Sequence, residues 1–156
     1  MNYYFFTKNL PNELTTLITE YCCPETDYYR DKILLIANTK GINRNGFNTR
    51  DERWRSSTVD TKASVHNIMR CIEEIPAIIR PLKTAYILGS YGAKHSIEYY
   101  REKCLKVKDG YISNGEFMIA MIMLGHEYKR PDDSLNAVFR AGYLPRRLMP
   151  KGYDRR

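Results

Sequence analysis

The chain has 156 residues, a mass of 18.3 kDa and a formal net charge of +7. This length is typical of one domain, and a hydrophobic fraction of 43% is enough for a globular core. The longest apolar run, residues 117–124, is far shorter than the roughly 20 residues of a membrane-spanning helix. The opening residues lack the basic leader of a secretory signal peptide. These features predict a single domain over residues 1–156, located in the cytoplasm and without membrane contact.

The N-terminal quarter predicts one strand-like segment and two helices. Residues 3–7 are aromatic and strand-like. Residues 13–21 repeat apolar side chains every three to four positions, which is typical of an amphipathic helix. A second helix is expected between Thr26 or Asp27, which can cap its start, and Gly41, which can end it. Its apolar run is too short to exclude a strand, and the capping residues favour the helix.

Residues 41–58 are the most loop-like stretch inside the chain. They are polar, basic and rich in turn-forming residues, and no apolar period marks a buried face. Loops of this length are usually functional or disordered. The single tryptophan, Trp54, lies here between Arg53 and Arg55. The segment is therefore a candidate contact surface.

The middle of the chain predicts two more helices. Asp60 can cap a segment whose apolar residues form one stripe as far as Pro76. Prolines, and then Gly89, indicate a chain reversal before the next helix. Ser90 has the position of an N-cap for a helix over residues 91–104.

The clearest helix signal follows. Ser113 and Glu116 have the spacing of a capping box, in which each side chain bonds the backbone amide of the other residue. Residues 117–124 are apolar on nearly every side, so this helix should lie at the centre of the core. A short helical segment is expected over residues 132–139. The predicted fold class is mainly α: one compact domain of about five or six helices, with up to two short strands at the N-terminus.

The strongest local pattern begins at Ser90. It reads Ser-Tyr-Gly-Ala-Lys-His, continues to Glu98, and resumes at Tyr111 with Tyr-Ile-Ser-Asn-Gly-Glu-Phe-Met-Ile-Ala. This resembles a motif of uncharacterised small proteins from phages, plasmids and integrated elements, of the form S-Y-G-x-K-H followed by Y-x-S-N-G-x-F-I-x-A. The resemblance implies a mobile-element origin and does not indicate a biochemical activity.

A structural role accounts for the same pattern, because two capped helices with polar residues at their contacts would produce it. The motif residues interpreted in this way are Ser90, Tyr91, Lys94, His95, Glu98, Ser113, Asn114 and Glu116. The three histidines of the chain match no known metal signature. Neither a metal nor another cofactor is expected.

Positive charge is concentrated in two segments that flank a near-neutral body. Residues 40–58 hold five basic side chains against two acidic ones, and the tail over residues 140–156, expected to be partly flexible, holds six against one. This distribution suits an anionic surface such as nucleic acid. The leading hypothesis is a nucleic-acid-binding accessory protein of a mobile element that contacts mainly phosphates, with Trp54 as a stacking candidate. The predicted contact residues are Arg44, Arg50, Arg53, Trp54, Arg55, Lys129, Arg130, Arg146 and Arg147.

Two other functions stay open. A protein-interaction module could use tyrosine, tryptophan and arginine side chains to bind or inhibit a host complex with an acidic surface. An enzyme could use Tyr91, His95 and Glu98, with the histidine as base and the carboxylate orienting it. That function requires the three groups to meet in a concave pocket. The sequence has no serine-nucleophile elbow, phosphate-binding glycine loop or paired-carboxylate motif, so catalysis is not the leading hypothesis.

Overall fold

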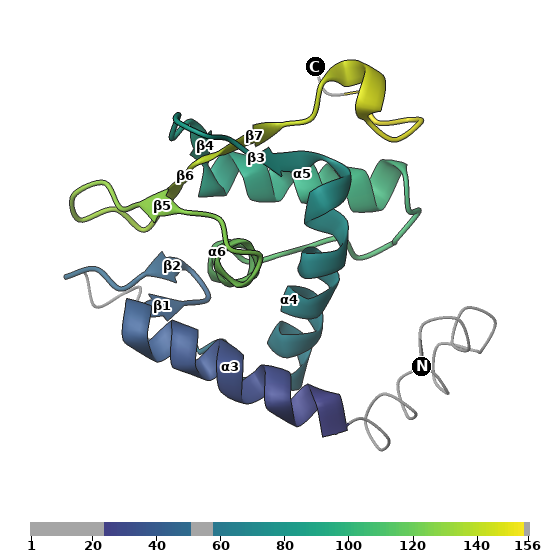
Figure 1. The fold of residues 1–156 in the computed structure, drawn as a ribbon. Coiled ribbons are helices and arrows are strands. Elements are labelled where there is room, and N and C mark those ends of the chain that lie inside the picture. The colour runs from purple at the N-terminus through teal and green to yellow at the C-terminus, as the bar shows by residue number, and fades with distance from the viewer. Residues whose placement is uncertain (1–23, 51–57, 155–156) are drawn as a thin grey trace.

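The computed structural model of the chain describes residues 24–50 and 58–154. This part forms four α-helices and three small antiparallel sheets. Figure 1 shows α6 (Asn114–Met123) end-on at the centre, with α3 (Pro24–Lys40), α4 (Lys62–Glu74) and α5 (Ser90–Lys103) arranged around it. The strand predicted over residues 3–7 and the helix over 13–21 lie outside the described residues.

The helix α6 is surrounded by other elements, as its apolar sequence requires. Its residues 114–121 are all buried. The helices α4 and α5 pack against it, together with both strands of the hairpin formed by β1 (Ile42–Asn43) and β2 (Gly46–Phe47). The predicted capping box is confirmed, since the Glu116 amide donates to Ser113 Oγ at 3.2 Å and the Ser113 amide donates to Glu116 Oε2 at 2.9 Å.

The helices α3, α4 and α5 form in the segments where the sequence predicts helices, but their predicted N-caps are wrong. The helix α3 begins at Pro24, so Thr26 and Asp27 lie inside its first turn and do not cap it. The N-cap of α4 is Thr61 in place of Asp60, and Thr61 Oγ1 accepts a hydrogen bond from the Ser64 amide at 3.1 Å. The helix α5 begins at Ser90 itself. Ser90 Oγ accepts a hydrogen bond from the distant Ala137 amide at 3.1 Å, so the hydroxyl joins two segments and caps neither.

The predicted fold class, mainly α with five or six helices, is wrong: the described part is mixed α/β. The strand β3 (Ile79–Pro81) pairs with β7 (Ala141–Tyr143), and β6 (Val138–Phe139) lies between β4 (Leu88–Gly89) and β5 (Tyr128–Lys129). Strands of two or three residues show no alternation in a sequence, and only their partners stabilise them. This is why the pattern favoured helices.

Two segments show the error directly. Residues 132–139, predicted as a helix, pass through a turn and end in β6. The predicted loop over residues 41–58 contains the β1–β2 hairpin, whose Ile42 and Phe47 are buried. Two apolar residues are enough to anchor a tight hairpin when a core helix lies beside it. None of the helices in the described ranges is long and apolar enough to span a membrane.

Candidate functional site

Two segments far apart in the sequence meet beside the β1–β2 hairpin. The Phe47 amide donates to the Leu135 carbonyl at 3.0 Å, and the Phe47 ring centroid lies 5.7 Å from that of Tyr128. Arg130 Nη2 donates to the Asn48 carbonyl at 2.6 Å across 82 positions of sequence. These contacts place Arg130 beside the segment that follows β2 and contains Arg50.

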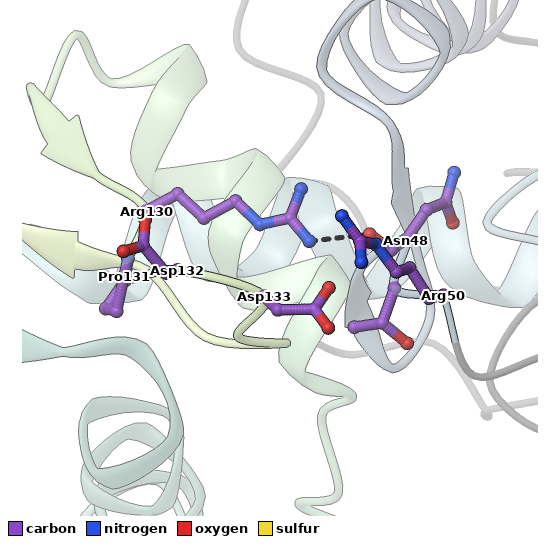
Figure 2. A pocket seen from close by; sticks show the side chains of 7 residues that line it. Asn48, Arg50, Arg130, Pro131, Asp132 and Asp133 are labelled. Carbon is purple, nitrogen blue, oxygen red and sulfur yellow. Dashed lines mark hydrogen bonds between the residues drawn. The ribbon is translucent and has the colours of Figure 1, made fainter.

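An open pocket lies at this junction, lined by residues 48–50 and 130–133 (Figure 2). The guanidinium of Arg130 is held in place, since it also donates to the Ser134 carbonyl at 3.2 Å and lies 4.8 Å from the Phe47 ring centroid. Arg50 is exposed, and no acidic side chain of the described residues pairs with it. The Asp133 carboxylate points toward the two guanidinium groups in Figure 2. With Asp132 also in the lining, the pocket has two positive and two negative side chains.

Two other predicted contact residues each contact a neighbouring side chain. Arg44 Nε lies 3.7 Å from the buried Glu116 Oε1. Lys129 Nζ lies 4.5 Å from the centroid of the Tyr86 ring, a cation–π contact that leaves the charge of the ammonium in place.

The C-terminal arginines form a separate basic region. Arg146 pairs with Asp154 at 2.5 Å, whereas Arg147 is exposed and has no ion pair within the described residues. Both belong to η3 (Arg146–Leu148), which Figure 1 shows well away from the β1–β2 hairpin. The predicted contact residues Arg53, Trp54 and Arg55 lie outside the described residues.

The motif residues of α5 form a second cluster around one carboxylate. Lys94 is only 5% exposed, and its Nζ donates to Glu98 Oε1 at 3.0 Å. The Ile112 amide donates to the same oxygen at 3.0 Å. His95 Nδ1 lies 2.6 Å from Glu98 Oε2. Glu98 therefore ties the first half of α5 to the segment that leads into α6.

Two exposed tyrosine rings complete this cluster. Lys94 Nζ lies 5.4 Å from the ring centroid of Tyr91 and 5.2 Å from that of Tyr111. The Tyr91 ring also contacts the His95 ring edge-on, with centroids 4.7 Å apart. The sequence pattern contains both tyrosines, but only the fold shows that they share one cation.

The remaining motif residues hold the fold together. Asn114 Nδ2 donates to the Asn45 carbonyl at 3.1 Å and to the Leu135 carbonyl at 3.3 Å. The next residue is Gly115, where a Cβ would lie 1.7 Å from the carbonyl oxygen of Asn43. This half of the motif therefore docks the β1–β2 hairpin onto the start of α6.

The three groups of the enzyme hypothesis do meet, since Tyr91 contacts His95 and His95 contacts Glu98. This pairing orients the imidazole as a carboxylate orients a catalytic base. The pocket of Figure 2 is lined by other residues, so these groups do not face it.

Two regions of the described part are accessible to a ligand. One presents arginine side chains at a pocket, and the other presents tyrosine rings around a buried lysine. The hairpin basic site consists of Arg50 and Arg130, and the tyrosine cluster consists of Tyr91, Lys94 and Tyr111. Both bring together residues from separate segments of the chain. No protein-family model, curated protein or solved structure matches this chain.

Proposed function

We propose that the protein binds nucleic acid through phosphate contacts at the hairpin basic site, as an accessory protein of a mobile genetic element. One observation carries the binding proposal: the hydrogen bond from Arg130 to the Asn48 carbonyl joins two basic segments that are 82 positions apart. The mobile-element role rests on the resemblance of the motif that begins at Ser90.

The chemistry of the site suits phosphate oxygens. Carbonyl oxygens hold the Arg130 guanidinium in place without cancelling its charge. Arg50 is exposed and has no acidic partner in the described part of the chain, so its donors are free for a phosphate. Asp132 and Asp133 oppose anion binding at the same pocket. We therefore expect modest affinity that falls steeply with salt and shows no sequence preference, because phosphates carry no sequence information.

The test compares two double variants that each remove two positive charges. Arg50→Gln with Arg130→Gln changes the hairpin basic site, and Arg146→Gln with Arg147→Gln changes the C-terminal region. Circular dichroism checks that both variants fold. Binding of a labelled duplex is measured by fluorescence anisotropy at about 50 and about 200 mM salt. The hairpin variant should lose about tenfold in affinity, and its log–log salt slope should fall by about 0.9 for each phosphate contact removed. The C-terminal variant should stay close to the wild type.

Two results would contradict the proposal. Equal losses in the two double variants would show that only the total charge of the protein matters. If the wild type did not bind duplex or single strands at low micromolar concentration and low salt, nucleic-acid binding would be rejected. A protein-interaction module would then be the better hypothesis, and nuclease-treated lysate would be the place to search for its partner.

A further inference from the structure

The described part of the chain leaves three tyrosines more than half exposed, and two of them lie together. Tyr91 is 57% exposed and Tyr111 is 58% exposed, while Tyr28 lies on α3. Tyr91 belongs to the first turn of α5, and Tyr111 to the segment before α6. Both rings contact the same ammonium group, that of Lys94. Two tyrosines that are 20 positions apart in the sequence therefore form one aromatic surface.

This surface is rigid because a single carboxylate fixes its parts. Glu98 holds the Lys94 ammonium and, through the neighbouring Ile112 amide, the backbone next to Tyr111. It also holds His95, whose ring supports that of Tyr91. Exposed rings that are fixed before binding lose little conformational freedom when a ligand stacks on them.

Cations lie along the same segment as Tyr111. Lys106 and Lys108 are exposed, and neither has an ion pair within the described residues. The Val107 amide donates to the Arg101 carbonyl at 3.0 Å, so this segment runs back along α5 toward the tyrosine cluster. The ligand chemistry that fits exposed flat rings, with exposed ammonium groups on the segment that leads to one of them, is a flat aromatic group linked to anions.

We propose that the tyrosine cluster binds unpaired bases of a single-stranded nucleic acid, with Lys106 and Lys108 at its phosphates. Bases in a duplex are already stacked and cannot cover a tyrosine ring, whereas the bases of a single strand can. The inference rests on the proposed function and adds to it a preference for single strands. Because every base has an aromatic face, the preference extends to all sequences.

The first experiment uses three probes and the unaltered protein. These are a labelled oligothymidylate, a strand of the same length whose bases are replaced by abasic sites, and a duplex. The first two carry the same phosphates and differ only in their bases. Oligothymidylate should bind at least about fivefold more tightly than the abasic strand for each stacked base. Equal affinity for all three probes would overturn the inference while leaving the proposed function intact, and absence of all binding would reject both.

The second experiment removes the rings. Tyr91→Ser with Tyr111→Ser should abolish the difference between oligothymidylate and the abasic strand and leave duplex binding unchanged. Tyr91→Phe with Tyr111→Phe keeps both rings and should retain the difference. Tyr28→Ser, which removes an exposed tyrosine from α3, is the matched control. If the serine double variant still bound oligothymidylate more tightly than the abasic strand, the inference would be overturned. Circular dichroism checks that each variant folds. The first experiment does not depend on this check, because it uses only the unaltered protein.

Discussion

At the scale of single residues, several polar side chains of this protein form hydrogen bonds with partners far away in the sequence. The position of Ser90 predicts a cap for its own helix, but its hydroxyl bonds the Ala137 amide, 47 positions away. Asn114 lies in a recognisable motif, but its two carbonyl partners belong to other segments. The sequence identifies such residues as capable of hydrogen bonds. It does not specify their partners, because a side chain bonds whatever the fold brings near it.

His126 provides a test at this scale. Its Nδ1 is buried without a hydrogen-bond partner in the described part of the chain, and burial lowers its pKa below 6.5. The unfolded chain therefore binds a proton at a higher pH than the folded one does. The stability that depends on neutral His126 is therefore fully present above pH 6.5, and it is lost as the pH falls below this value.

We expect the melting temperature of the wild type to fall more than that of His126→Gln between about pH 7.5 and about pH 5.5. Thermal melts of both proteins across this range measure the difference. Parallel curves for the two proteins would show that protonation of His126 is not coupled to folding.

At the scale of elements, local signals predict the helices and fail for the strands. The start of α6 could be predicted because Ser113 and Glu116 are three residues apart and bond each other. The strands β4, β5 and β6 have two residues each and exist only because they pair. No local preference marks such a strand, so the sequence of a mixed fold has the pattern of a helical one.

Replacing Ser113 tests the local signal. Ser113→Ala removes the acceptor of the Glu116 amide inside the core and should lower the free energy of unfolding by about 1 kcal/mol. Thr84→Ala, a change of an exposed residue between β3 and β4, is the control and should have no effect. Urea denaturation measures both. A stable Ser113→Ala protein would mean that the capping box contributes little to the fold.

At the scale of the whole molecule, one buried ion pair joins two of the helices that surround α6. Arg101 of α5 is fully buried, and its Nε lies 2.5 Å from Oε2 of Glu74 in α4. Arg70 also approaches this carboxylate, at 3.4 Å. No sequence pattern indicates this burial, since Arg101 lies among charged residues at the end of its helix.

Removing one partner leaves the other charge buried and unpaired. Glu74→Ala should therefore destabilise the protein by about 3–5 kcal/mol. Glu102→Ala, which breaks the exposed pair with Lys103, should cause a much smaller loss, because water screens an exposed ion pair. The comparison is made by urea denaturation. A similar small loss in both variants would mean that water reaches the Arg101 guanidinium.

The close docking of the β1–β2 hairpin has a consequence for what can vary during evolution. A Cβ at Gly46 would lie 2.0 Å from the Leu135 carbonyl oxygen, and one at Gly115 would lie 1.7 Å from that of Asn43. Backbone occupies both spaces, so no rotamer of a larger residue can relieve the overlap. Any homologue that keeps this docking must have glycine at both positions, whatever length of chain separates them. Two glycines, one in a short hairpin and one directly after the Ser-Asn at the start of a helix, are therefore a signature by which distant homologues of this chain could be identified.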